Sequence, residues 1–175
     1  MSSPASSSAA LPIAHVVLRI LIVVNWLYGA AIAVLLVAMP TRAWIMSALG
    51  VGPGPEAERL ILGLRAIAVV GLVTIPLNYV ILKRLLAIVG TVRAGDPFVT
   101  ANASRLQGIA WSLLALQLLG LVVAAIAKAA STPAHPLDLD AGFSINGWLA
   151  VLLMFLLARV FEEGALMRDD LEGTV

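Results

Sequence analysis

Residues 83–105, KRLLAIVGTVRAGDPFVTANASR, separate the second and third of four long apolar runs. This stretch, which we call the central segment, carries four basic side chains and a single acid, Asp96. In a chain that crosses a membrane, short loops rich in lysine and arginine stay on the cytoplasmic side. The central segment therefore sets the direction of crossing, and it is the largest feature that such a chain offers to the cytoplasm.

The composition indicates a membrane protein. Of the 175 residues, 61% are hydrophobic and 12% are charged, and the mean hydropathy is +1.03. Soluble domains are roughly 45–50% apolar and about 25% charged. A water-soluble core in a chain this short could not bury so many apolar side chains. We therefore expect the lipid bilayer to be the solvent for much of the surface.

The four apolar runs are long enough to cross a bilayer as helices, the last of them only just. They cover residues 16–39, 60–82, 106–127 and 145–161. We predict an all-α fold, a bundle of four transmembrane helices that forms a single membrane domain over residues 13–168. A Ser- and Ala-rich arm at 1–12 precedes it and should be disordered, and an acidic tail follows at 169–175.

The segment after the first run, TRAWIMSAL at 41–49, places Trp44, Ile45, Ala48 and Leu49 at helical spacing. It is too short to span a membrane, and tryptophan prefers the level of the lipid headgroups. We therefore predict a short interfacial helix in the first outer loop.

The second and third runs carry signals for their ends and their packing. Apolar residues recur at helical spacing beyond Lys83, so the second helix should extend past the bilayer. Asp96-Pro97 predicts the turn that follows, with Thr100 or Asn102 as the N-cap of the third helix. One face of the third run is formed by small residues, which let a neighbouring helix approach closely: Gly108, Ser112, Gly120 and Ala124.

Lysine and arginine predict the orientation. With both termini and the central segment inside, the cytoplasmic side holds seven of the 11 basic residues: Arg19, Lys83, Arg84, Arg93, Arg105, Arg159 and Arg168. The other side holds Arg42, Arg59, Arg65 and Lys128. The positive-inside rule thus predicts a multi-pass protein of a cytoplasmic membrane with its N- and C-termini inside.

The sequence contains no recognisable catalytic motif. There is no nucleophile elbow, P-loop or HExxH motif, and no cysteine for disulfides, metal ligation or nucleophilic attack. The histidines, His15 and His135, fall on opposite sides of the predicted membrane and cannot share a metal. We predict no enzymatic activity, no cofactor and no metal site. The net charge of +1 also argues against direct binding of nucleic acid.

Polar side chains within the apolar runs form a second group of candidate site residues. Asn25, Asn78 and Gln117 are the uncharged members. Such amides can hydrogen-bond between helices, each contributing roughly 0.6–2 kcal/mol. Alternatively, Asn25 and Gln117 line a small polar cavity for a ligand. The sequence leaves both interpretations open.

Two arginines, Arg19 and Arg65, belong to the same group because an ionised group at a helix centre costs about 2.5–3.5 kcal/mol. Arg19 either extends to the headgroups or pairs with Glu162 or Glu163, which would tie the first helix to the last. Arg65 should reach the outer interface, where acids near both outer loops could pair with it: Glu56, Glu58, Asp138 and Asp140.

Two segments carry a family resemblance. In the central segment the matching residues are Gly95, Pro97, Phe98, Asn102, Arg105 and Leu106. In the tail they are Val160, Phe161, Gly164, Leu166, Arg168, Glu172, Thr174 and Val175. The sequence resembles a family of small bacterial four-helix membrane proteins known only as a domain of unknown function, often encoded beside a small helix-turn-helix regulator. Gly173 departs from the pattern, at a position usually apolar. The resemblance implies a fold and a bacterial inner-membrane location, but no activity.

We expect a regulatory or accessory protein whose central segment and acidic tail form a cytoplasmic docking surface. Phe98 would anchor a partner such as a small transcriptional regulator, with Arg93 and Arg105 setting its orientation. The candidate partner-binding residues are Arg93, Gly95, Pro97, Phe98, Asn102, Arg105, Glu162 and Glu163. Equally, Arg93 and Arg105 could bind anionic headgroups, at about 1 kcal/mol each.

Two other functions stay open. One is a small-molecule transporter or ligand-binding membrane protein, with Pro76 as a hinge. The other is a structural subunit that packs against further membrane subunits.

Overall fold

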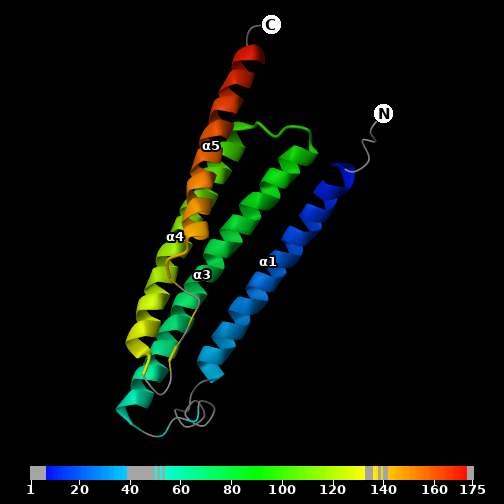
Figure 1. Cartoon of the computed structure of the whole chain (residues 1–175). Coiled ribbons are helices and arrows are strands. Elements are labelled where there is room, and N and C mark those ends of the chain that lie inside the picture. The colour runs from blue at the N-terminus through cyan, green and yellow to red at the C-terminus, as the bar shows by residue number, and fades with distance from the viewer. Residues whose placement is uncertain are drawn as a thin grey trace. The chain divides into compact units, whose positions relative to one another are not determined.

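The computed structural model describes residues 7–38, 50, 52, 54–132, 136, 137, 139 and 142–172. Its helices in this part of the chain are α1 (Ser7–Ala38), α3 (Pro55–Arg93), α4 (Thr100–Ala130) and α5 (Ile145–Glu172) (Figure 1). No strand occurs among these residues. The all-α prediction is confirmed, whereas the interfacial helix expected at 41–49 lies outside the described residues.

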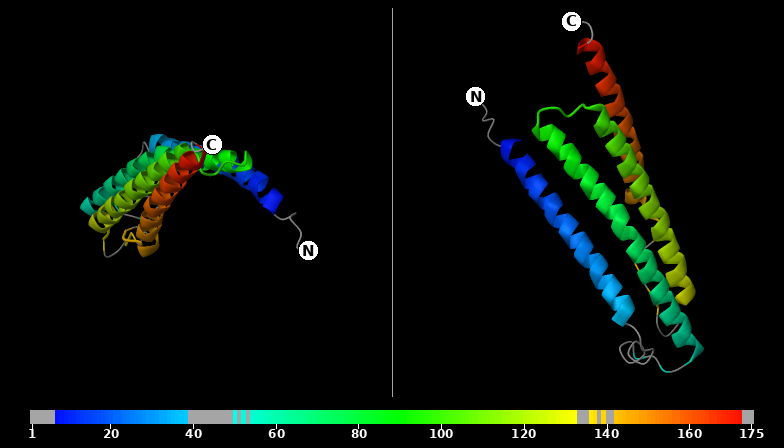
Figure 2. Two further views of the ribbon diagram at one scale, coloured as in Figure 1. Left: turned by 90° about the horizontal axis from the view of Figure 1, so that it is seen from above. Right: turned by 180° about the vertical axis from the view of Figure 1, so that it is seen from behind.

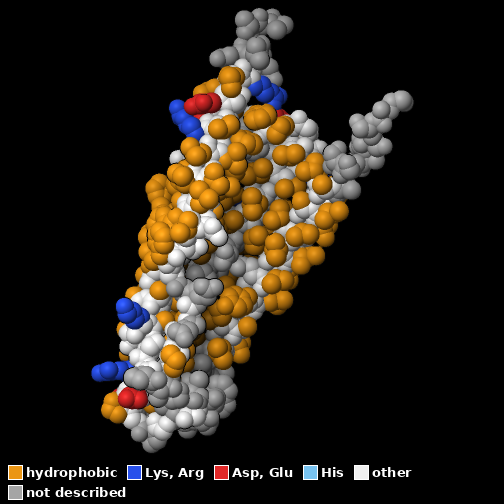
Figure 3. Space-filling model, in the orientation of Figure 1, with side chains coloured by type: hydrophobic (Ala, Val, Ile, Leu, Met, Phe, Trp, Pro, Cys, Tyr) orange, Lys and Arg blue, Asp and Glu red, His pale blue; other side chains and the backbone are white. Residues whose placement is uncertain are grey.

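Within the described ranges, three helices are long and apolar enough to cross a membrane: α1 over Ala10–Val37, and α3 and α4 over their full lengths. Only 6%, 22% and 17% of their most apolar windows is buried inside the protein. Apolar side chains cover much of the face seen in Figure 3, and charged side chains lie toward helix ends. Apolar helices exposed to this extent are suited to lipid and not to water, which indicates a membrane protein.

The start of α1 differs from the expected one, whereas the end of α3 agrees with it. Helix α1 already begins at Ser7, inside the segment predicted as a disordered arm, and it includes Pro12. Ala9, Ala10 and Leu11 before that proline are strong helix formers. Helix α3 starts with Pro55, a residue favoured at a first helical position, and has Glu56 and Glu58 in its first turn. It continues to Arg93, so the predicted extension beyond Lys83 is confirmed.

The described residues form two compact units. Unit 1 contains those up to Asn25, Leu77–Ala115 and those from Ile145 onward; unit 2 contains Trp26–Pro76 and Leu116–Ser144. The core of unit 1 brings together α3, α4 and α5. It consists of Leu106, Ile109 and Ala158, packed against Ile81, Leu85, Ile88, Leu113, Met154 and Phe161. Figure 2 shows α5 beside the first part of α4 from two further directions.

Small residues permit close helix contacts in unit 2. A Cβ atom added to Gly63 of α3 would lie 2.3 Å from the Cβ of Ala130 in α4, and one added to Gly29 of α1 would lie 3.1 Å from Ile75 side-chain atoms. On α4, a Cβ added at Gly120 would lie 3.8 Å from the carbonyl oxygen of Gly142. Glycine at positions 29 and 63 therefore permits the close helix spacing, whereas the contact at Gly120 is an ordinary van der Waals contact.

Candidate functional site

The loop at residues 94–99 connects α3 to α4 and begins with a sharp change of direction. Gly95 has a φ of +84°, a conformation that favours glycine. The Gly95 N–H donates to the Val92 carbonyl at 3.1 Å, and the Asp96 N–H donates to the Thr91 carbonyl at 3.0 Å. This pair of bonds is a Schellman motif, which satisfies the last carbonyls of α3. Pro97 follows directly, at a position where proline is common because it cannot continue the helix.

Asn102 is the central polar residue of this region, and it is completely buried. Its Nδ2 donates to Thr91 Oγ1 at 2.7 Å and to the Pro97 carbonyl at 2.8 Å, and its Oδ1 accepts a bond from Arg105 at 2.7 Å. Helix α4 begins at Thr100, so Asn102 lies inside the first turn and is not the N-cap. Its side chain joins α3, the loop and α4, and it is too buried to touch a partner.

Phe98 attaches the loop to α5. Its ring lies 5.2 Å from the Phe161 ring, centroid to centroid, at an interplanar angle of 37°. A Cβ added at Gly164 would lie 3.1 Å from Phe98 Cδ1, so glycine leaves the space that the ring needs. Phe98 is nevertheless 44% exposed. It therefore packs within the chain and also offers an apolar surface outside it.

An ion pair between Asp96 and Arg168 makes a second connection to α5. Both side chains are more than a third exposed, so the pair contributes at most about 1 kcal/mol. We call Asp96, Phe98, Asn102, Phe161 and Arg168 the latch. The latch joins the two segments that carry the family resemblance, although they lie far apart in the chain.

The other predicted partner-binding residues surround the latch. Arg93 and Gly95 are exposed. Arg105 is partly buried, and it donates a hydrogen bond to Asn102. Glu162 and Glu163 are exposed on α5.

Of the two alternatives for Arg19, the pairing with Glu162 or Glu163 does not occur in the structure. Glu162 Oε2 accepts a hydrogen bond from Arg159 Nη1 of its own helix at 2.9 Å, and Glu163 Oε1 forms an ion pair with Arg159 Nε at 3.1 Å. Residues three and four positions apart on a helix are neighbours, so this pairing needs no second helix. Arg19 is exposed and forms no ion pair with any residue in the described ranges.

The three amides within the apolar runs, Asn25, Asn78 and Gln117, are all partly buried. Asn25 and Asn78 belong to unit 1. In unit 2, Gln117 Nε2 donates to the Ser144 carbonyl at 3.5 Å, a long bond between α4 and the segment preceding α5. Pro76 lies in a groove of about 410 Å³ between α1 and α3. The groove is lined by Trp26, Gly29, Ala30, Ala33, Leu72, Ile75 and Pro76.

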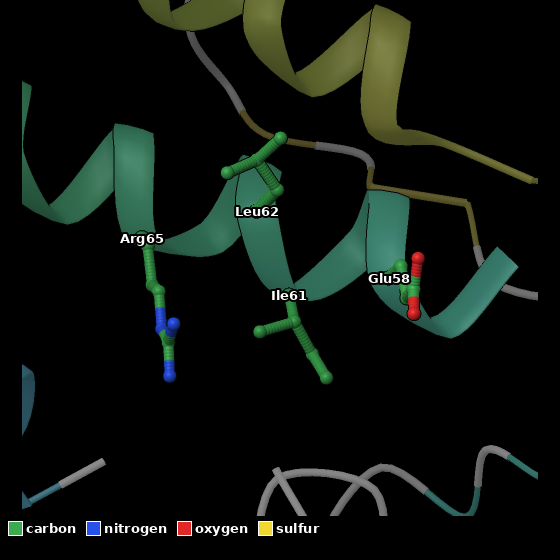
Figure 4. Close-up of a pocket in the computed structure, with 4 residues that line it drawn as sticks. All are labelled: Glu58, Ile61, Leu62 and Arg65. Atoms are coloured by element: carbon green, nitrogen blue, oxygen red, sulfur yellow. The ribbon is translucent and has the colours of Figure 1, made fainter. Parts of the chain in front are cut away.

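Arg65 borders a cavity of about 310 Å³ at the start of α3, with Glu58, Ile61 and Leu62. In Figure 4, Arg65 and Ile61 extend from the same side of α3, and Leu62 extends from the opposite side. The acids proposed to pair with Arg65 include Asp138 and Asp140, which lie outside the described residues. Within the described ranges, no three His, Asp or Glu side chains are grouped to hold a metal ion.

Sequence reasoning missed the position of Arg84. A Cβ added at Gly108 would lie 0.7 Å from Arg84 Nη1, so the guanidinium of α3 occupies the space that any side chain on Gly108 would fill. That nitrogen is buried and has no hydrogen-bond partner in the described part of the chain. The available signal was Gly108 itself, because the missing side chain leaves room for a long side chain from a neighbouring helix as well as for its backbone.

A comparison with protein families finds one whose model, described as "Protein of unknown function (DUF2975)", matches residues 44–175. The matched range includes α3, α4, α5 and the whole latch, and it begins after α1. Comparisons with curated proteins and with solved structures found no match.

Proposed function

The chain belongs to this family of proteins of unknown function, and from that premise we propose that it is a regulatory or accessory protein of the bacterial cytoplasmic membrane. In this proposal it performs no catalysis and presents the latch region to a cytoplasmic partner. The observation that carries it is the joining of two distant segments by the Asp96–Arg168 pair and the Phe98–Phe161 contact.

The proposed topology has four spans with both termini in the cytoplasm. Three spans are α1, α3 and α4, and the fourth is α5, whose residues 145–158 include no charged side chain. The excess of lysine and arginine near the latch supports a cytoplasmic position for it.

Docking is supported by the way in which the latch holds exposed groups in fixed positions. Phe98 is held by Phe161, so the exposed part of its ring is positioned before a partner arrives. Preorganised groups lose less conformational entropy on binding than mobile ones. Arg93 adds a cation beside the loop, and Glu162 and Glu163 add acids on α5. Opposed charges of this kind would fix the orientation of a partner such as a small transcriptional regulator.

We expect replacement of Arg93 and Glu163 by glutamine to weaken partner binding about tenfold, which corresponds to 1.4 kcal/mol. Neither residue belongs to the latch, so the fold should persist. The tagged full-length chain, expressed at its native level, is cross-linked in cells and purified in mild detergent, and bound proteins are quantified by mass spectrometry. Lys128→Gln, an exposed change outside unit 1, is the matched control. If the double variant and the control retain the same soluble proteins in equal amounts, docking through Arg93 and Glu163 is excluded.

Binding of an apolar small molecule is the second candidate, favoured by the groove at Pro76. Because proline has no N–H, the Leu72 carbonyl in this groove lacks its usual helical donor. None of the described residues that line the groove is charged, so it would suit an apolar ligand better than an ion.

A further inference from the structure

Unit 1 contains a pocket of about 360 Å³ between the beginning of α4 and α5. Its volume lies within the range typical of small-ligand sites, roughly 300–1,000 Å³. Ala103 of α4 and Phe155 and Ala158 of α5 form its apolar part. Thr100, Ser104 and Gln107 contribute polar groups from α4. The pocket therefore has an apolar portion and a polar portion, both built from regular helices.

The pocket lies where both helices change from apolar to polar sequence. The apolar run of α4 begins at Leu106, just after Ser104, and that of α5 ends at Phe161, just after Arg159. In a membrane, this change of polarity marks the headgroup level. A lipid beside the two helices would place its headgroup against the polar portion and its acyl chains beside Phe155.

Two opposite charges occupy the polar portion. Arg159 Nη1 lies 2.9 Å from Glu162 Oε2, and both side chains are more than half exposed. A guanidinium has five N–H donors, so Arg159 can bind a phosphate while it keeps its carboxylate partner. The Ser104 hydroxyl donates to the Ala101 carbonyl at 2.9 Å, and its lone pairs can still accept a bond.

The local charge selects among headgroups. Arg159 pairs with both Glu162 and Glu163, so the three side chains together carry one negative charge. An anionic headgroup would be repelled by this excess, whereas a headgroup with a phosphate and a primary ammonium could satisfy both signs. A quaternary ammonium has no N–H and cannot donate a hydrogen bond to Glu162.

We propose that this pocket is a binding site for an aminophospholipid headgroup, with Arg159 on the phosphate and Glu162 on the primary ammonium. Thr100 and Ser104 lie beside the phosphate, and Phe155 contacts the first part of the acyl chains. This proposal depends on the membrane placement of the chain but not on the docking partner, so its failure would leave docking untouched.

The test is native mass spectrometry of the full-length chain in detergent, titrated separately with phosphatidylethanolamine, phosphatidylcholine and phosphatidylglycerol of identical acyl chains. We expect retention of phosphatidylethanolamine about tenfold above the other two. Glu162→Gln should abolish the advantage of phosphatidylethanolamine over phosphatidylcholine, and Arg159→Gln should weaken the binding of all three lipids. The matched control is Glu163→Gln, which removes a neighbouring acid that does not line the pocket and should keep the advantage over phosphatidylcholine.

Equal retention of the three lipids by the wild-type chain would overturn the proposal, as would an unchanged preference in Glu162→Gln. A further arm adds soluble phosphoethanolamine as a competitor. Displacement of the lipid at equal concentration would assign the pocket to a soluble compound and overturn the lipid assignment; no displacement supports it. Thermal unfolding of each variant shows whether a loss of lipid reflects a loss of fold.

Discussion

Replacement of Asn102 by leucine is expected to lower the free energy of unfolding by about 3 kcal/mol. The side chain is completely buried and makes hydrogen bonds to Thr91, Pro97 and Arg105. Leucine cannot make these bonds, and a buried polar group left without its partner costs about 1–3 kcal/mol. The Thr91 hydroxyl is affected least by the loss of Asn102, because it still donates to the Ile88 carbonyl at 2.8 Å. The Pro97 carbonyl and the Arg105 guanidinium lose a partner each.

The measurement is unfolding in mixed dodecyl maltoside and SDS micelles, followed by tryptophan fluorescence. Ser104→Ala is the control, because this exposed hydroxyl bonds only to a carbonyl of its own helix; it should change the free energy by less than about 0.5 kcal/mol. Asn102→Asp keeps the shape and the acceptor for Arg105 but loses both N–H donors. Its free energy of unfolding should lie between those of Asn102→Leu and Ser104→Ala. Equal stability of Asn102→Leu and Ser104→Ala would show that Asn102 does not hold the loop.

The second large effect is expected from Gly63→Ala in unit 2. The added Cβ would lie 2.3 Å from the Cβ of Ala130. A Cβ atom is fixed to its backbone, so α3 and α4 must separate to make room. Overpacking of this kind costs about 1–3 kcal/mol, which outweighs the gain of up to about 1 kcal/mol from replacing glycine within a helix.

Gly71→Ala provides a matched control on the same helix. There the added Cβ would lie 3.5 Å from Ile32 Cδ1, which is ordinary van der Waals contact. We expect this variant to be neutral or slightly more stable in the same micelle assay. If the two alanine variants were equally stable, the close approach of Gly63 and Ala130 would not be a feature of the native packing.

The helices could be predicted from the sequence because lipid-facing apolar runs are nearly continuous. The end of α3 could also be predicted, because Gly95, Asp96 and Pro97 are typical of the end of a helix. The start of α1 was not, because a Ser- and Ala-rich segment without charge is compatible both with disorder and with helix.

The individual contacts were harder to predict than the helices. The sequence indicated that Phe98, Asn102 and Arg168 belong to motifs, but not that they join the loop to α4 and α5. The sequence left open a pairing of Arg19 with Glu162 or Glu163, whereas both glutamates pair with Arg159, three and four positions before them on α5. Which side chains pair depends on how each helix is rotated about its own axis. In runs of Leu, Val and Ala most faces of the helix are equally apolar, so the sequence does not determine this rotation.

The central claim is that this chain crosses the membrane with the loop at 94–99 on the cytoplasmic side. The absence of cysteine makes a direct test simple, because each engineered cysteine is then the only one. Ala94→Cys and Lys128→Cys, both at exposed positions, are labelled in cells with a membrane-impermeant maleimide. The reagent reaches the periplasm through outer-membrane pores where an outer membrane is present.

The account predicts that Lys128→Cys reacts in intact cells, whereas Ala94→Cys reacts only after the cytoplasmic membrane is opened. Labelling of Ala94→Cys in intact cells, with Lys128→Cys protected, would contradict it. Recovery of the chain from the soluble fraction without detergent would contradict it as well.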